Sequence, residues 1–313
     1  MIQLTPPAAD PDRPRQSVCA VLVTFRPETQ ALCAAVGAVR QQVDRVVVVD
    51  NASSGIDSAV ADQDVVLLRQ PSNIGLAGAQ NIGIDWAREN GHTHVLILDQ
   101  DSVPAPDMVS ELLSALARLN VDRRVAAVGP RFRDAREDHD APFIKVAFPM
   151  STKLRCDATN PDVECDFLIS SGALIPLAVL DDVGGMDDRL FIDNVDMEWS
   201  FRVRARGYAL YGVCRARMEH RLGDARQSVL GGRATVVTHG PVRLYYIMRN
   251  RLTLYRLPHT PRVWIAQDLP RVLAKFLIFA VLVGPQGRNV RYMMRGLRDG
   301  AAGRLGPCPL KEH

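Results

Sequence analysis

Two carboxylates, Asp99 and Asp101, follow an apolar run that has the composition of a buried strand. They belong to VLILDQDS (95–102), with Gln100 between them and two prolines shortly after. Carboxylates taken out of water are costly unless a partner offsets their desolvation. Hard divalent cations take oxygen ligands and bind through one or two carboxylates together with substrate phosphates. The spacing therefore indicates a site for Mg²⁺ or Mn²⁺ with a diphosphate, although a D-x-D pattern alone is a weak signal.

Polar side chains also follow two other strand-like runs. Thr24 comes at the end of the first run, and Asp50 and Asn51 come directly after VVVV. A carboxylate at a strand end can accept a hydrogen bond from a ring N–H, such as N3–H of uracil or thymine. Ligands of open α/β sheets bind outside the carboxyl ends of the strands, so we expect these side chains to share one site with Asp99 and Asp101.

The segment PSNIGLAGAQNIG (71–83) is rich in glycine and asparagine. Gly75 and Gly78 permit close backbone approach, and Asn73 and Asn81 offer amides at a helix start, where anions bind. The segment is neither G-x-G-x-x-G nor a P-loop, so it predicts no dinucleotide or ATP site. Either asparagine alone could equally serve as a turn or cap residue.

Three acids lie close together in FIDNVDMEW: Asp193, Asp196 and Glu198. Like charges this near one another raise the pKa of at least one group, which suits a general base. Two structural roles stay open, because Asp193 could cap a helix that begins near Asn194, and Glu198 could pair with Arg202 at i+4.

His220 follows another strand-like run in MEHRLGD (218–224). A neutral imidazole could complete a site for Mn²⁺ or Mg²⁺ that carboxylates begin. A single histidine is more often structural than a ligand, so the prediction that His220 binds a metal depends on the carboxylates near it.

The elements that must position these residues alternate between strands and helices. We expect strands at 17–25, 45–51, 65–70, 94–101 and 125–132, and helices at 28–41, 76–90 and 106–119. This order predicts a mostly parallel, Rossmann-like α/β sheet with helices on both faces. An irregular stretch follows at 133–165, and FLISSGALIPL (167–177) returns to strand character with an interruption at Gly172.

The C-terminal region has a different charge from the rest of the chain. Residues 241–313 carry 13 Lys/Arg and 3 Asp/Glu, a net charge of +10, whereas residues 1–240 carry 25 and 32, a net charge of −7. Residues 240–301 have an amphipathic helical pattern, and RVLAKFLIFAVLVG (271–284) is their most apolar run. It is shorter than the ~20 residues of a spanning helix. It could lie in a membrane interface or pack as a core helix.

The composition is that of an ordinary globular protein, with 47% hydrophobic and 23% charged residues. The segment MIQLTPPAADPDRPRQ has no apolar h-region, so we expect a disordered lead over residues 1–16 and no signal peptide. The six cysteines show no C-x-x-C pair and no zinc spacing, which favours reduced thiols in a cytosolic setting. A disulfide between Cys156 and Cys165 is possible but not expected.

Seven segments, in this order, resemble family 2 glycosyltransferases of the GT-A fold: VTF, VVVDNAS, NIGLAGAQNIG, LILDQDS, SSGALIP, FIDNVDMEWSFR and MEHRLGD. DQDS and FIDNVDMEW are most similar to the bacterial rhamnosyltransferases that use dTDP-L-rhamnose. The segments RLYYIMRN (243–250) and GLRDGAAGRLG (296–306) are similar to the C-terminal region of that branch, so the resemblance covers residues 17–306.

The resemblance implies a role for individual residues. Asp50 corresponds to the acid that recognises the base, Asp101 to the metal ligand on the diphosphate, and His220 to the metal-side histidine. Asp196 corresponds to the general base, with Val195 where the family has Glu. The residues expected to bind the donor are Thr24, Asp50, Asn73, Gly75, Asn81, Asp99 and Gln100, and Asp99 could also reach the metal. The residues expected to support the site or the acceptor are Gly172, Asp193, Glu198 and Trp199, the last of which could stack on a sugar or pack in the core.

The sequence thus predicts a GT-A catalytic domain at 17–240 and a basic amphipathic helical region at 241–313. The implied activity is inverting, metal-dependent transfer of L-rhamnose from dTDP-L-rhamnose to a lipid-linked or lipopolysaccharide O-antigen glycan. The expected location is cytoplasmic, on the inner face of the bacterial plasma membrane and against its anionic surface, with no nucleic acid partner. A UDP-sugar donor and a non-catalytic nucleotide- or membrane-binding module stay open as alternatives, and so does the oligomeric state. A sugar nucleotidylyltransferase is disfavoured, because VTFRPETQ lacks the basic Gly-rich loop that such an enzyme needs.

Overall fold

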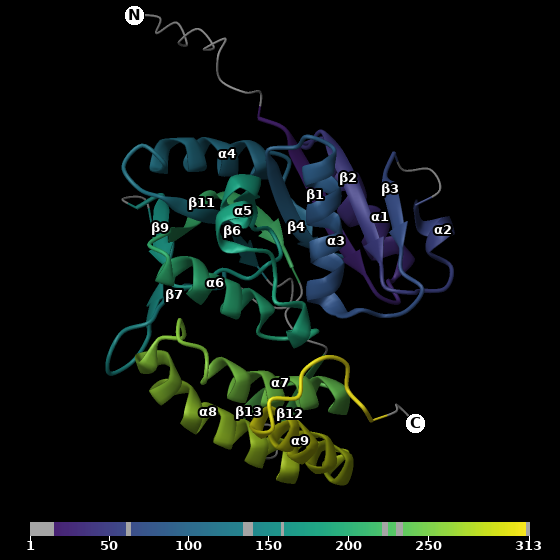
Figure 1. Cartoon of the computed structure of the whole chain (residues 1–313), viewed down its shortest axis with the longest axis vertical. Coiled ribbons are helices and arrows are strands. Elements are labelled where there is room, and N and C mark those ends of the chain that lie inside the picture. The colour runs from purple at the N-terminus through teal and green to yellow at the C-terminus, as the bar shows by residue number, and fades with distance from the viewer. Residues whose placement is uncertain are drawn as a thin grey trace, which may run out of the picture.

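The computed structural model describes residues 16–60, 64–133, 140–157, 160–220, 225–229 and 234–310, so most of the predicted lead lies outside it. One large sheet has the strand order β3-β2-β1-β4-β10-β6-β11-β5, with β9 paired to β11 (Figure 1). Its strands are β1 (Val18–Thr24), β2 (Arg45–Asp50), β3 (Val66–Arg69), β4 (His94–Asp99), β5 (Val103–Pro104), β6 (Val125–Arg133), β9 (Asp162–Cys165), β10 (Leu174–Pro176) and β11 (Ala209–Glu219). The pairs β1–β2, β1–β4, β2–β3 and β6–β11 are parallel, and β10 runs antiparallel between β4 and β6. The predicted, mostly parallel sheet is confirmed.

Helices cover both faces of this sheet, as predicted. One face packs against α1 (Thr29–Val39), α2 (Ile56–Val60) and α4 (Met108–Leu119), and the other against α3 (Gly75–Glu89), α5 (Leu177–Val183) and α6 (Val195–Ala205). Successive residues of β1 point to opposite faces of the sheet. Val21 belongs to the hydrophobic core under α3, α5 and α6, and Leu22 belongs to the core under α1, α2 and α4. Strands buried on both faces read as continuous apolar runs, which explains the Val-rich sequence of β1 and β2.

The irregular stretch at 133–165 contains a small hairpin of β7 (Phe143–Lys145) and β8 (Thr152–Leu154). The expected strand at 167–177 is reduced to β10. Gly172 turns the chain just before this strand with φ +86°, and a Cβ there would lie 2.6 Å from Pro130 Cγ. The backbone N–H of Gly172 donates to Ile97 O at 2.7 Å, which fixes the turn against β4.

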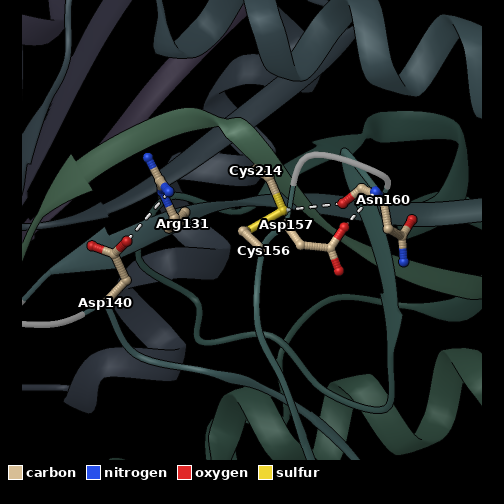
Figure 2. Close-up of a disulfide and its surroundings, with 6 residues drawn as sticks. All are labelled: Arg131, Asp140, Cys156, Asp157, Asn160 and Cys214. Carbon is tan, nitrogen blue, oxygen red and sulfur yellow. Dashed lines mark hydrogen bonds and ion pairs between the residues drawn. A yellow bond between two sulfur atoms is a disulfide. The ribbon is translucent and has the colours of Figure 1, made fainter.

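The cysteine prediction needs a correction. Cys156 forms a disulfide with Cys214 of β11, with their Cα atoms 5.5 Å apart (Figure 2). Antiparallel pairing sets Cys165 of β9 opposite Leu210, where its free thiol is buried in the core. Cys156 precedes β9 and lies beside the next part of β11. The structure therefore differs both from fully reduced thiols and from a Cys156–Cys165 pair.

The C-terminal region is helical, as predicted. It consists of α7 (Pro241–Leu254), α8 (Arg262–Val281) and α9 (Gln286–Ala301), which lie together below the sheet and α6 in Figure 1. A hairpin of β12 (Ala225–Val229) and β13 (Ala234–Thr238) precedes them. The helices share a core that includes Leu244, Met248, Phe279, Val283 and Met293. In the part of the chain that the structure describes, we find no helix with the length and apolarity to span a membrane.

Candidate active site

The ends of β1, β2 and β4 meet at one edge of the sheet. Register pairs Thr24 with Asp50 across β1 and β2, and Val23 with Asp99 across β1 and β4. The Thr24 hydroxyl donates to Asp50 Oδ1 at 2.9 Å, and the backbone N–H of Ser53 donates to Oδ2 at 2.9 Å. Asp50 is buried, so these two bonds hold its carboxylate in one orientation while each oxygen keeps a lone pair for a further donor.

Gln100 connects two strand ends. Its Oε1 accepts a hydrogen bond from the backbone N–H of Phe25, the residue after β1, at 2.9 Å. The side chain therefore ties the β4 end to the β1 end, and it lies at the predicted site in a supporting position.

The start of α3 is held by amide side chains. The backbone N–H of Gly75 donates to Asn73 Oδ1 at 2.9 Å, and Asn51 Nδ2 donates to Gly75 O at 3.2 Å. Gly75 has φ +85°, and a Cβ there would lie 2.6 Å from the carbonyl oxygen of Phe191. The glycine thus permits close contact with the loop before α6. Asn73 acts as a turn residue here, as one of the two open interpretations had it.

Asn81 lies away from the strand ends. Its Nδ2 donates to Met186 O at 2.9 Å, and its Oδ1 accepts from Met186 N at 2.8 Å. Both polar atoms of the amide are thus bonded to one backbone residue. We therefore leave Asn81 out of the donor site and assign it to anchoring the loop after α5.

Three predicted metal ligands come together. Single ligand atoms from Asp99, Asp101 and His220 all lie within 4.8 Å of one another. His220 Nε2 is 3.8 Å from Asp99 Oδ2, and His220 Nδ1 is 3.9 Å from Asp101 Oδ1. His220 is 8% exposed, and the two carboxylates are 34% and 33% exposed, so the cluster faces solvent on its acidic side. A cavity of about 320 Å³ beside it is lined by Asp101 and His220.

Two buried serines support this cluster, although no pattern in the sequence distinguishes them. Ser102 Oγ lies 2.8 Å from His220 Nδ1 and 2.7 Å from Ser171 Oγ, and Ser171 Oγ accepts from the backbone N–H of Asp99 at 3.1 Å. In the tautomer whose Nδ1–H donates to Ser102 Oγ, Nε2 carries no proton, and its lone pair is available to bind a metal ion. Such partners of a metal-binding histidine fix its tautomer and ring orientation.

The electrostatics of the cluster also fit a cation. Burial raises the pKa of Asp99, and the neighbouring Asp101 raises it further, against the lowering effects of His220 and Arg243. A bound divalent cation would offset both unfavourable contributions. The donor set of two carboxylates and one imidazole suits Mg²⁺ or Mn²⁺.

Asp196 lies in the first turn of α6, after a loop with unusual backbone geometry. Phe191, Asp193 and Asn194 have φ of 68°, 65° and 64°, values that are uncommon for residues other than glycine. Burial raises the pKa of Asp196 to about 6, with a hydrogen bond from the Met197 N–H opposing the rise and Asp193 and Asp99 adding to it. A carboxylate with a pKa near the working pH is suited to general base catalysis.

Side chains of α7 hold this loop. Asn250 Nδ2 lies within donor distance of three backbone carbonyl oxygens, those of Leu190 at 3.0 Å, Ile192 at 2.8 Å and Asp193 at 2.8 Å. Arg249 also donates to Leu190 O, at 2.7 Å. Asn250 and Arg249 are fully buried. The C-terminal region therefore positions the loop that precedes Asp196.

Asp193 pairs with Arg243, another residue of α7. Arg243 Nε lies 3.2 Å from Asp193 Oδ1 and 3.3 Å from Oδ2. The carboxylate thus joins the loop to α7, and the predicted cap of α6 is absent: the residue at the N-cap position is Asn194, whose side chain makes no capping hydrogen bond.

Two supporting residues have structural surroundings. Glu198 is buried and bonds Arg202 through both carboxylate oxygens at 2.9 Å, with His259 Nε2 also 2.9 Å away. Burial alone would raise the pKa of Glu198, but His259 and Arg202 outweigh burial and lower it. Trp199 is 4% exposed and its Nε1 donates to Gly184 O at 3.1 Å. Glu198 thus forms the expected i+4 pair, and the stacking role of Trp199 is replaced by core packing.

Comparisons with known proteins agree with this geometry. The profile of the family described as "Glycosyl transferase family 2" matches residues 20–180. A Shigella flexneri protein named dTDP-rhamnosyl transferase RfbF is 30% identical over 282 residues, which cover 89% of this chain and 92% of that protein.

Solved structures share the fold at low sequence identity. The crystal structure of GalNAc-T7 with UDP, GalNAc and Mn²⁺ superposes with a TM-score of 0.58 at 14% identity, covering 92% of this chain and 56% of that one. The structure of S. aureus TarS 1-349 superposes with a TM-score of 0.52 at 10% identity and covers 92% of both chains. The present chain therefore spans only about half of GalNAc-T7. From its sequence matches the chain belongs to glycosyl transferase family 2, and it is a glycosyltransferase with the GT-A fold.

Proposed function

We propose that the protein is an inverting, metal-dependent rhamnosyltransferase that uses dTDP-L-rhamnose. The observation that carries the proposal is the cluster of Asp99, Asp101 and His220 at the strand ends, with Asp196 close enough for the charge of Asp99 to raise its pKa. The choice of sugar rests on the similarity to dTDP-rhamnosyl transferase RfbF, which extends over nearly the whole chain.

Each part of the site has a role in this reaction. Asp99, Asp101 and His220 Nε2 would hold Mg²⁺ or Mn²⁺, which when bound stabilises the negative charge on the departing nucleoside diphosphate. Asp50 accepts the N3–H of the base and so orients the donor. Asp196 takes the proton of the acceptor hydroxyl as its oxygen bonds to the anomeric carbon from the side opposite the diphosphate, whose bond to that carbon breaks. Displacement from the opposite side inverts the anomeric configuration.

A UDP-sugar donor is the main alternative. Uracil and thymine present the same N3–H, so Asp50 does not distinguish between them. The base methyl group and the sugar must therefore be tested directly.

A thermal-shift panel tests the proposal with the full chain and dTDP, UDP, GDP or CMP, each with Mn²⁺, with Mg²⁺ or with EDTA. A ligand that binds only the folded state raises the melting temperature by mass action. We expect a shift with dTDP that requires the metal. A shift with UDP alone would replace the donor but keep the mechanism, and no shift with any nucleotide would favour a non-catalytic module. Release of dTDP from dTDP-L-rhamnose would then separate catalysis from binding.

We also propose that the enzyme works at the inner face of the plasma membrane on a glycan acceptor. Four exposed residues of α8 repeat at i+4 and form an apolar ridge, Leu269, Leu273, Leu277 and Val281. Exposed arginines lie nearby in sequence on α9, at positions 288, 291 and 298. An apolar face with basic neighbours favours the interface of an anionic bilayer.

Vesicle sedimentation tests the membrane proposal. The full chain should sediment with vesicles that contain anionic lipid and be released by high salt, because exposed charges are screened. Leu273→Glu should weaken binding, whereas Val121→Glu, at a side chain that is 80% exposed on the catalytic domain, should not. Equal sedimentation of the two variants would contradict a role for the ridge.

A further inference from the structure

A second cavity lies next to the candidate base, between the β7–β8 hairpin and α8. Its volume is about 520 Å³, and its lining includes Met197, the residue after Asp196, and Trp264 of α8. The hairpin is fastened to α8 by Gln267, whose Nε2 donates to Ala147 O at 2.6 Å and whose Oε1 accepts from Ser151 Oγ at 2.5 Å. The cavity is therefore formed by elements far apart in the sequence and bordered by the helix that carries Asp196.

The lining of this cavity is strongly basic. It contains Lys153, Arg251, Arg271 and Lys275 against one acid, Asp268. The acid is already paired, since it contacts Arg251 and accepts a hydrogen bond from the hydroxyl of Tyr255 at 2.6 Å. The other three cations form no ion pair with a carboxylate of the described residues. Within the part of the chain that the structure describes, the cavity thus has an excess of positive charge that its acidic lining does not balance.

Lys275 has an electrostatically unfavourable position in this cavity. It is half-buried, and burial lowers the pKa of its ammonium, with Arg251 and Arg243 lowering it further against the opposing effect of Asp193. A half-buried ammonium among other cations is expensive unless an anion joins it. The group is also close enough to Asp193 to link the cavity electrostatically with the loop before α6.

The edge of the cavity carries exposed apolar side chains. Phe148 is 83% exposed and Met150 is 75% exposed, and both lie in the hairpin turn next to Ser151, which lines the cavity. Large apolar side chains exposed on a loop beside a basic cavity are suited to an amphiphilic ligand with an apolar chain and an anionic head.

We propose that this cavity binds a phosphoryl group of the acceptor, carried on an apolar chain. The proposal rests on the proposed glycosyl transfer, and it adds an acceptor subsite whose lining shares no residue with the donor cluster. Lys275 and Arg271 bind the phosphoryl oxygens, Phe148 and Met150 contact the chain, and the acceptor hydroxyl is thereby presented to Asp196. Lys275 and Arg271 are thus positioning residues for the acceptor.

The test measures binding of farnesyl diphosphate to the full chain by calorimetry in EDTA, so that the carboxylate cluster has no metal with which to hold a diphosphate. We expect Lys275→Gln to weaken binding by about tenfold or more, since a hydrogen bond from a charged donor is lost. Lys275→Arg should retain most of the affinity. The matched control is Arg40→Gln, which removes one exposed positive charge at the end of α1.

Two further ligands identify the source of the phosphoryl group. Inorganic pyrophosphate should bind more weakly than farnesyl diphosphate, and farnesol should bind without dependence on Lys275. Pyrophosphate binding as tightly as farnesyl diphosphate would overturn the role of the apolar chain. Equal affinity of farnesyl diphosphate for the parent and Lys275→Gln, or no binding to the parent, would overturn the subsite.

The metal-dependent shift with dTDP, measured on the same variants, separates this proposal from the proposed function. Lys275→Gln should keep the dTDP shift, because the cavity is distinct from the donor cluster. A parent chain without any nucleotide shift but with Lys275-dependent diphosphate binding would refute the donor assignment and leave the subsite in place. The reverse pattern would refute the subsite alone.

Discussion

The donor side and the acceptor side of the site are built in different ways. Asp50 and Asp99 end β2 and β4, which pair in parallel with the two sides of β1, and Asp101 follows Asp99 by two residues, so the sheet places all three at one edge. Asp196 follows a loop with three non-glycine residues at positive φ, and that loop is held by α7, more than fifty residues further along the chain. The first arrangement follows from topology, whereas the second depends on particular long-range hydrogen bonds. Substitutions should therefore separate the two sides, with donor binding lost on one and turnover lost on the other.

The largest effect is expected at the base. Asp196→Asn keeps the shape of the side chain but removes its ability to take a proton, so kcat should fall about 10²–10⁴-fold. The metal-dependent dTDP shift should be unchanged, because the donor cluster is intact. Initial rates with dTDP-L-rhamnose and calorimetry with dTDP measure the two properties. Turnover close to that of the parent would exclude Asp196 as the base.

The donor side should respond to a residue that touches no substrate. Ser102→Ala removes the partner of His220 Nδ1, so the ring loses its fixed orientation and metal affinity should fall about 10–100-fold. Mn²⁺ titration in the presence of dTDP measures this change. Ser110→Ala is the control, because that exposed hydroxyl bonds only the local backbone of α4. A normal kcat at saturating Mn²⁺ would show that the loss is confined to the metal.

These two substitutions also separate the site residues that can be predicted from the sequence from those that cannot. Asp99, Asp101 and His220 were predictable because their types and their places at strand ends each indicate a metal. Ser102 and Ser171 were not, since buried serines have no distinguishing pattern until the strands are assembled. The roles of Asn73 and Asn81 were left open for a related reason: amides near a helix start serve equally well as backbone anchors, and only the fold shows that Asn73 bonds Gly75 and Asn81 bonds Met186.

The C-terminal region shows the same limit. Its helices and its basic charge follow from composition and periodicity, but the Arg249–Asn250 contacts with the loop at 190–193 do not. The sequence left open whether residues 271–284 lie in a membrane interface or pack as a core helix. Phe279 lies in the core of this region and Leu277 is 53% exposed on the same helix, so the contact with a membrane stays a prediction. The Cys156–Cys214 pair was likewise hidden, since its members are separated by 58 residues.

Asn250→Ala tests whether α7 supports the acceptor side alone. The change removes the buried donor of Ile192 O and Asp193 O, while Leu190 O keeps its hydrogen bond from Arg249. The loss should lower the free energy of unfolding by about 1–3 kcal/mol. A loop that relaxes would misplace Asp196, so kcat should fall about tenfold. The dTDP shift should stay close to that of the parent, because the strand ends do not contact Asn250. Equal losses of donor affinity and turnover would show that Asn250 supports the donor side as well as the acceptor side.

The smallest effect is the acid limb of the pH profile, and it bears on the origin of the base. Because burial raises the pKa of Asp196 from 3.8 to about 6, its carboxylate is half protonated near pH 6, where kcat at saturating donor should be half its plateau value. Below that pH the rate should fall about tenfold per unit, since only the ionised form accepts a proton.

The raised pKa also means that ionised Asp196 destabilises the fold at neutral pH. Asp196→Asn should therefore be more stable than the parent at pH 7, and this difference should shrink as the pH falls toward 4. A rate limb without that change in stability would assign the titration to the donor carboxylates, whereas both together would assign it to Asp196 on the acceptor side.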